Sequence, residues 1–339
     1  MKRILSKKMP LTYVIGLFLL AIVLTIAITR WTSSMQTASE TVTASQNCIT
    51  KSKRINGYEL IKPILYYDEE CPSENLSTIN GTISSIINTY KQSQNVSSAS
   101  VYFRDFDSSE WTCVNETEHY EPGSLFKVTM LIAALKMSEQ QPGLLNKKIQ
   151  FSKKFDIPKN TAYQSKTLQL GQNYTLRELL TYMIVHSDND ATALVQNNID
   201  TAVLIKLFND LGLETPSYQS KQYFFTAQNY SLFMRLIYNA SYLNEENSAF
   251  AAQLLSQSTF QDGILKGLPA NTRVAHKFGE AGTASEIQLH ESALVYLNDR
   301  TYLLTVMTKG KDLKTLSNLL AEISKAVYDS QKETALSSL

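Results

Sequence analysis

The chain of 339 residues has few of the side chains that hold metals or build disulfide frameworks. Its three cysteines, Cys48, Cys71 and Cys113, lack metal-site spacing, and its four histidines are dispersed without an H-E-x-x-H motif. We therefore expect no metal and no other cofactor. An oxidising compartment would permit one disulfide and leave one thiol over, whereas all three cysteines would otherwise stay reduced.

Acidic side chains are absent from the first 30 residues, where four basic residues precede an uncharged, almost wholly apolar run at residues 11–29. A helix of that length just spans a bilayer, and a positive flank stays in the cytoplasm. The pattern predicts a cytoplasmic basic tail at residues 1–10 and a transmembrane anchor at 11–29, with the remainder outside the cytoplasm. A signal peptide cleaved near Ala38 is the alternative.

A basic stripe is also missing from the exported part. Beyond residue 30, 27 basic and 31 acidic side chains remain, a net charge of −4. This balance excludes steering onto nucleic acid, so the membrane contact is assigned to residues 11–29 alone. Residues 31–52 are rich in Ser and Thr, which predicts a flexible linker over residues 30–56 and a folded domain over residues 57–339.

The periodicity of apolar residues predicts an α+β fold. Helical spacing occurs at residues 75–92, after Gly123, from Thr175, and at residues 201–211, 227–238, 247–257 and 312–328. Strand-like patterns occur at residues 98–106, 110–115, 272–278, 285–297 and 300–308. This order predicts one antiparallel sheet built from both ends of the domain and flanked by helices, an α/β sandwich with an inserted all-α subdomain.

Three short motifs carry the chemistry. Ser124 and Lys127 are three residues apart, which on a helix places a hydroxyl beside a base one turn away. Ser187-Asp188-Asn189 and Lys277-Phe278-Gly279 follow in order. The alternative is that these are ordinary helix and cap residues, but their joint occurrence in this order argues against chance.

The three motifs and the layout resemble the penicillin-recognising serine hydrolases, specifically the class A β-lactamase-like branch. The resemblance covers roughly residues 75–328. It implies that Ser124 attacks an acyl carbon, that Lys127 takes the hydroxyl proton, and that Ser187 passes a proton to the leaving nitrogen. Lys277 would supply positive potential, and burial beside it would lower the pKa of Lys127.

The resemblance also implies a substrate-binding set. Asn189 would hold Lys127 and the substrate amide, and Gly279 belongs to the strand that edges the site. The backbone N–H groups of Ser124 and Glu280 would form the oxyanion hole. Phe278 stands where the family has a hydroxyl that binds the substrate carboxylate, and a phenyl ring cannot donate that bond. His186 and His276 adjoin two motifs and are expected to be packing residues.

A second departure concerns the water-activating glutamate of class A β-lactamases. None of the acids between residues 190 and 276 lies in the usual Glu-x-x-Leu-Asn setting, and Glu214 is the nearest candidate. The favoured hypothesis is thus a membrane-tethered enzyme that forms an acyl-enzyme with a cell-wall peptide or a β-lactam-like amide. The alternatives are a true β-lactamase and a catalytically impaired wall-binding protein.

Overall fold

The computed structural model describes Thr25 and residues 49–57, 60, 62–69, 71–156, 163, 165–216, 223–297 and 300–337. The chain divides into the units Met1–Ile49 and Thr50–Leu339, and the description below concerns the second. The predicted basic tail and nearly all of the predicted anchor at residues 11–29 lie outside the described residues. Among the helices that are described, none is both long enough and apolar enough to cross a membrane.

The centre of the domain is a five-stranded antiparallel sheet in the order β4-β3-β9-β8-β7. Its strands come from both ends of the domain, namely β3 (Val96–Asp105), β4 (Trp111–Val114), β7 (Arg273–Gly282), β8 (Ile287–Leu297) and β9 (Arg300–Gly310). The strands β8 and β9 are buried along most of their length because helices cover both faces of the sheet. The predicted antiparallel sheet assembled from the two ends of the domain is confirmed.

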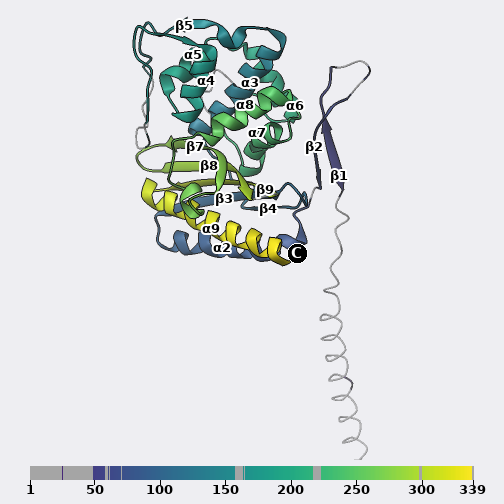
Figure 1. Ribbon diagram of the computed structural model, residues 1–339. Coiled ribbons are helices and arrows are strands. Elements are labelled where there is room, and N and C mark those ends of the chain that lie inside the picture. Colours follow the sequence, from purple (N-terminus) through teal and green to yellow (C-terminus); the bar gives the residue numbers. More distant parts are fainter. Residues whose placement is uncertain are drawn as a thin grey trace, which may run out of the picture. The chain divides into compact units, whose positions relative to one another are not determined.

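Helices form a layer on each side of this sheet (Figure 1). One face is covered by α2 (Ser77–Gln92), which follows the 3-10 turn η1 (Glu74–Leu76), and by α9 (Leu313–Ser337). Three isoleucines of α2 at four-residue spacing, Ile79, Ile83 and Ile87, point into the core. This spacing places them on one side of the helix, so α2 buries a single apolar stripe.

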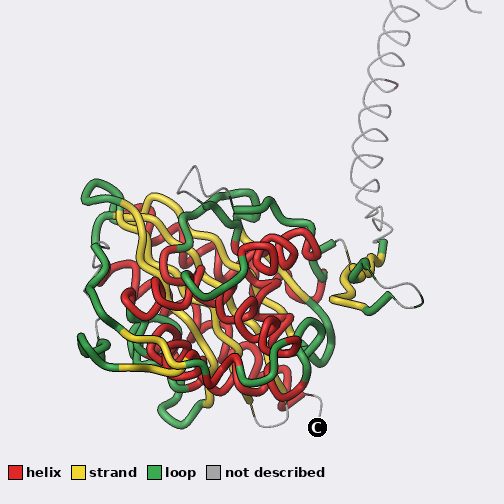
Figure 2. The backbone as a smooth tube through the Cα atoms, turned by 90° about the horizontal axis from the view of Figure 1, so that it is seen from above, coloured by secondary structure: helices red, strands yellow, loops and turns green. Residues whose placement is uncertain are grey.

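The opposite layer is the inserted helical subdomain, which lies over the strands when seen from above (Figure 2). Its helices are α3 (Lys127–Gln140), α4 (Leu176–Val185), α5 (Asn189–Gln196), α6 (Thr201–Leu211), α7 (Ala227–Tyr238) and α8 (Glu245–Ser256). Between α3 and α4 lie η3 (Leu144–Asn146) and the two-stranded pair β5 (Lys148–Gln150) and β6 (Asn173–Thr175). The 3-10 turn η2 (Gly123–Phe126) leads into α3, and η4 (Leu265–Gly267) lies between α8 and β7 and contacts α9.

Local capping explains why several of these helices begin where the sequence predicts. Thr175 and Glu178 form a reciprocal capping box at the start of α4, with Glu178 N donating to Thr175 Oγ1 at 3.2 Å and Thr175 N donating to the Glu178 carboxylate at 2.7 Å. The side chains of Asp200 and Thr226 cap α6 and α7 by a single hydrogen bond each, accepted from a backbone N–H of the first turn. The predicted ranges 201–211 and 227–238 agree with the observed helices.

The predicted flexible linker over residues 30–56 is wrong at its C-terminal end. Thr50–Arg54 forms the strand β1, which pairs antiparallel with β2 (Ile64–Glu69). Backbone pairing supplies the hydrogen bonds of this hairpin, so β1 needs no apolar side chains of its own. The hairpin is fixed to the domain by the buried Leu65 and by the carboxylate of Asp68.

The Asp68 carboxylate neutralises two buried arginines, with Oδ1 2.5 Å from Arg104 Nη1 and Oδ2 2.7 Å from Arg235 Nη1. Asp68→Ala should lower the free energy of unfolding by about 2–4 kcal/mol, because it leaves two guanidinium groups without their counter-charge. Urea denaturation measures the change. The matched control is Asp329→Ala, which removes an exposed ion pair with Lys325 and should change stability by less than about 0.5 kcal/mol. Equal effects of the two substitutions would contradict the role of Asp68.

Candidate active site

One serine hydroxyl lies between the two lysines that the motifs predicted. Ser187 Oγ is 3.2 Å from Lys127 Nζ and 3.0 Å from Lys277 Nζ. Lys127 also donates to the backbone oxygen of Ser187 at 2.6 Å and to Asn189 Oδ1 at 2.8 Å. Four of the predicted residues, which extend in the sequence from Lys127 to Lys277, thus meet in three dimensions.

Ser187 has an unusual backbone conformation, and its neighbour Asp188 fixes the turn that contains it. Its φ of 54° lies in the left-handed region, which is uncommon for a residue other than glycine. Asp188 caps α5 by accepting a hydrogen bond of 2.6 Å from Ala191 N, while its own N–H donates to Tyr182 O at 3.0 Å. The turn between α4 and α5 therefore aims the Ser187 hydroxyl at both lysines, and Asp188 has the structural role of a helix cap.

Burial changes the acid–base properties of both lysines. It lowers the pKa of Lys127 to about 7, while the nearby Asp188 carboxylate opposes the shift. Lys277 has no exposed surface, and burial followed by repulsion from Lys127 holds its pKa well below the ordinary value. Lys127 can thus carry an uncharged amine near neutral pH, which a base in proton transfer requires, and Lys277 gives up its proton more readily than an ordinary lysine does.

Ser124 lies in η2, a 3-10 turn that leads into α3, rather than on the same α-helix as Lys127. Two glycines bring this turn against β7. A Cβ atom on Gly123 would lie 2.0 Å from Glu280 O, and a Cβ atom on Gly279 would lie 2.3 Å from Pro122 O. The backbones on either side of Ser124 and at Glu280 are therefore in direct contact, on the two segments whose N–H groups were predicted to form the oxyanion hole.

The lysines do not hold the Ser124 hydroxyl in this structure. The three hydrogen bonds of Lys127 Nζ go to Ser187 and Asn189, and none of the described hydrogen bonds joins Nζ to Ser124. Lys127 is the first residue of α3, directly after the 3-10 turn η2 that contains Ser124.

Phe278 lies under its neighbours instead of facing solvent. Its ring stacks on Phe260 with a centroid distance of 4.3 Å and meets the Tyr163 ring edge-on at 5.7 Å. The Glu280 side chain, two residues further along β7, is half-buried, and this burial raises its pKa although Lys277 opposes the shift.

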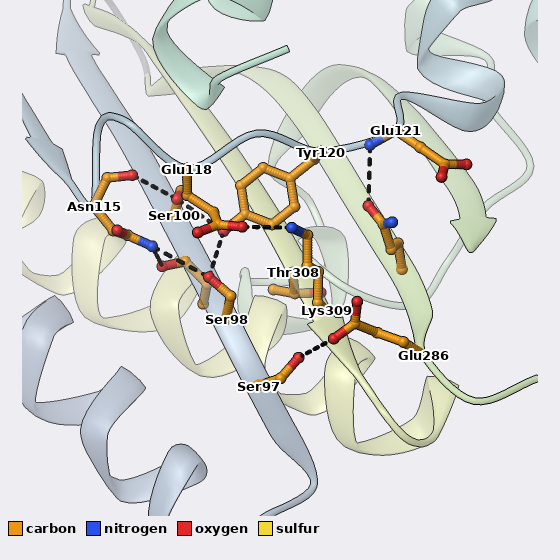
Figure 3. Close-up of polar contacts among 12 residues, drawn as sticks. Ser97, Ser98, Ser100, Asn115, Glu118, Tyr120, Glu121, Glu286, Thr308 and Lys309 are labelled. Atoms are coloured by element: carbon orange, nitrogen blue, oxygen red, sulfur yellow. Dashed lines mark hydrogen bonds and ion pairs between the residues drawn. The ribbon is translucent and has the colours of Figure 1, made fainter. Parts of the chain in front are cut away.

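A polar network that the sequence did not reveal fixes the segment preceding Ser124 to the sheet (Figure 3). Tyr120 OH lies 3.1 Å from Ser98 Oγ and 2.8 Å from Ser100 Oγ on β3. Glu121 N donates to Gln288 Oε1 on β8 at 3.1 Å. Three and four positions before Ser124, the chain is thus bound to β8 through Glu121 and to β3 through Tyr120.

His290 completes this attachment. Its Nε2 donates to Glu121 O at 2.9 Å, and its Nδ1 accepts from Thr308 N at 3.1 Å. A carbonyl only accepts and an amide N–H only donates, so the ring is neutral with its proton on Nε2. Burial lowers the pKa of His290 to about 3, which keeps the ring in this state. The only signal in the sequence was a histidine within the strand predicted at residues 285–297.

The other histidines near the motifs have structural partners. His276 Nδ1 is 2.6 Å from Glu291 Oε1, and the second oxygen of this buried carboxylate accepts from Ile264 N at 2.6 Å. His186 Nδ1 is 3.1 Å from Ser165 Oγ. Their expected packing roles agree with these contacts. Within the described residues, no three His, Cys, Asp or Glu side chains are grouped as a metal site would need.

Comparison with known proteins assigns this site to a family. Residues 81–331 match the beta-lactamase enzyme family. The chain belongs to this family. Membership makes it a serine hydrolase that acts on amide bonds, as the motifs indicated. A beta-lactamase from Bacteroides uniformis is 28% identical over 252 residues, which cover 67% of this chain and 84% of that protein.

Solved structures of beta-lactamases and related proteins share its fold. PBP-A superposes with a TM-score of 0.64 at 20% identity, over 78% of this chain and 98% of PBP-A. A beta-lactamase from Chitinophaga pinensis gives a TM-score of 0.64 at 19% identity, over 75% and 99% of the two chains. The TLA-3 extended-spectrum beta-lactamase gives 0.65 at 19% identity, over 74% and 99%. At these low identities, the superpositions show that this beta-lactamase family member shares the fold of the three proteins.

The cysteines of this family member are in two states. Cys71 is disulfide-bonded, and Cys113 is a free thiol on β4. Burial raises the pKa of Cys113 to about 12, with the Glu116 carboxylate adding to the shift. A thiol in this state is protonated and unreactive at neutral pH.

The contact between η2 and β7 gives a test of how Ser124 is positioned. Gly279→Ala should lower the free energy of unfolding by about 1–3 kcal/mol, because the new methyl group meets backbone atoms that cannot rotate away. The matched control is Gly81→Ala, where nothing lies within 4 Å and alanine is the better helix former. Gly81→Ala should raise stability by up to about 1 kcal/mol, and thermal unfolding compares the two. A Gly279→Ala protein as stable as wild type would mean that β7 and η2 are not in tight contact.

Proposed function

We propose that this beta-lactamase family member forms an acyl-enzyme on Ser124, with a cell-wall peptide or a β-lactam-like amide as acyl donor. The observation that carries the proposal is the Ser187 hydroxyl held between Lys127 and Lys277, beside the turn that carries Ser124. The continuous segment η2–α3 would supply the nucleophile and the base, and the turn before α5 would supply the proton relay, which are the groups that covalent catalysis by a serine requires.

In the proposed acylation, the proton of Ser124 reaches the leaving nitrogen through Lys127 and Ser187. Ser124 Oγ forms a bond to the acyl carbon, and its proton passes to the neutral amine of Lys127. The C–N bond of the substrate then breaks, and the leaving nitrogen takes a proton from Ser187. Ser187 recovers a proton from Lys127 across the 3.2 Å hydrogen bond. Lys127 ends the step neutral, as it began.

The negative charge that develops on the carbonyl oxygen needs hydrogen-bond donors. The backbone N–H groups of Ser124 and Glu280 belong to segments in direct contact, which supports their assignment as the oxyanion hole. Such donors act without reorganisation because the backbone is already fixed, and losing one typically costs about 3–4 kcal/mol of barrier.

Among the described residues, we find no evident general base for hydrolysis of the acyl-enzyme. Glu214 is exposed just after α6, and both oxygens of Glu291 are bonded to His276 and Ile264. The residues that hold Lys127 contribute no carboxylate. We therefore propose slow deacylation, which favours a penicillin-binding enzyme over an efficient β-lactamase. The relative from Bacteroides uniformis described as a beta-lactamase supports efficient hydrolysis as the second candidate.

The proposed location is the outer side of the cell membrane, with a single anchor at residues 11–29. Its support is the apolar run of that segment, the four bases ahead of it and the absence of acids among the first 30 residues. A cell-wall substrate lies within reach of an enzyme tethered in this position.

Labelling with a fluorescent penicillin tests the proposed function. The full chain should acquire a covalent label that persists for many minutes, and nitrocefin should be hydrolysed slowly or not at all. Ser124→Ala should abolish labelling, whereas Ser85→Ala, an exposed serine on the far helix α2, should leave it unchanged. Rapid nitrocefin turnover would instead establish a true β-lactamase. Labelling that survives in Ser124→Ala would refute the assigned nucleophile.

The pH dependence of acylation tests Lys127. The base must be uncharged, and its pKa of about 7 predicts that the rate rises with pH through about 7 and levels off above it. At pH 6 about one tenth of the amine is neutral, so the rate should be roughly tenfold below the plateau. Stopped-flow or quenched labelling from pH 5 to 9 measures the profile.

Two variants assign this profile to its residue. Lys127→Ala should abolish acylation with an unfolding midpoint within a few degrees of wild type, because the lost hydrogen bonds are offset by removal of a buried amine. Lys136→Ala, on the same helix but bonded to Glu139, should keep both the rate and the profile. Wild-type labelling rates in Lys127→Ala would show that another group is the base.

A further inference from the structure

Lys277 already has a complete set of partners inside the protein. Its Nζ is 3.0 Å from Ser187 Oγ, 3.0 Å from Phe278 O and 4.1 Å from the centroid of the Phe278 ring. An ammonium group has three N–H donors, and these contacts occupy all of them: one hydroxyl, one carbonyl and one aromatic face. The side chain has no exposed surface. An incoming anion would find no free donor on this lysine.

Phe278 is the residue that closes Lys277 off. Its ring is fixed by stacking on Phe260 at 4.3 Å with an interplanar angle of 18°, and by the edge contact with Tyr163. Aromatic pairs in such arrangements resist displacement, because each contact adds to the free energy of burial. The ring therefore stays beside Nζ instead of swinging away when a ligand arrives.

The charges around Lys277 also disfavour an anionic ligand. From β7 itself comes Glu280, from β8 comes the buried Glu291, and from α3 comes Lys127. The two carboxylates already act on the Lys277 ammonium, and a ligand carboxylate would have to compete with them. A neutral ligand group meets no such competition.

We propose that Phe278 covers Lys277 so that this lysine serves Ser187 alone, and that the site therefore reacts faster with acyl donors that lack a carboxylate beside the scissile amide than with matched donors that carry one. The inference rests on the proposed acyl-enzyme and narrows its substrate class. In this arrangement Lys277 is a proton partner of the relay serine and does not anchor the substrate. Phe278 is the specificity-determining residue.

A matched pair of probes tests the substrate class, namely benzylpenicillin and its methyl ester, which differ in a single negative charge. Acylation of the full chain is followed by intact-protein mass spectrometry, with Ser124→Ala to establish the attachment site. The quantity compared between variants is the ratio of the two acylation rates, which cancels the intrinsic reactivity of each probe. Phe278→Thr should shift this ratio toward the free acid by at least tenfold. Phe278→Leu, which removes the aromatic face but keeps an apolar cover and donates no hydrogen bond, should shift the ratio by less than Phe278→Thr does.

A second measurement tests whether Phe278 shields Lys277 from solvent, and it does not require catalysis. Reductive methylation of the native chain, mapped by peptide mass spectrometry, should spare Lys277 in wild type and modify it in Phe278→Thr, while exposed lysines such as Lys325 react equally in both. Equal ester-to-acid ratios in wild type and Phe278→Thr would overturn the specificity proposal, as would modification of Lys277 in native wild type. If neither probe acylates Ser124 in any variant, the acyl-enzyme itself fails and the substrate class fails with it. In that case, a Lys277 that resists methylation in wild type would show that Phe278 does cover it and that only the proposed chemistry is wrong.

Discussion

The burial of two lysines against one serine hydroxyl is the constraint on which the site depends. An ammonium group without water is costly to bury, so each lysine needs oxygen partners with fixed positions. Asn189 and the Ser187 carbonyl supply them for Lys127, and the Phe278 carbonyl supplies one for Lys277. The same desolvation that makes the arrangement costly lowers the pKa of both amines, and it brings that of Lys127 to about 7.

The sheet meets this requirement by bringing distant segments to one place. β7 carries Lys277, and its Gly279 allows η2 to approach within backbone contact. β8 contributes His290 and Gln288, which bind the chain at Glu121 just ahead of Ser124. Because β7 and β8 are paired along their length, with Gly279 opposite His290, the two attachments of the segment around Ser124 lie side by side on the sheet. The position of Ser124 is therefore set by the sheet and not by the helix that it precedes.

Local signals explain which parts of the fold could be predicted from the sequence. The helices α6 and α7 were predicted with their observed bounds because Asp200 and Thr226 cap them within the segment itself. The strand β1 was missed because its pairing with β2 depends on residues 10 or more positions away and on no apolar pattern of its own. The Arg104–Asp68–Arg235 cluster was missed for the same reason, since Asp68 is 167 residues away from Arg235.

The candidate site shows the same division. The motif residues could be named from the sequence because each stands in a short ordered pattern, and the structure brings Lys127, Ser187, Asn189 and Lys277 together. What Phe278 does could not be read from its position in the motif. Strand alternation alone would place Lys277 and Phe278 on opposite faces of β7. The lysine nevertheless bends back to its neighbour's ring and carbonyl, because Phe260 and Tyr163 hold that ring where an ammonium can lie over it. The packing of Phe260 and Tyr163 on Phe278, which the motif does not reveal, thus determines whether the charge of Lys277 is available to a substrate.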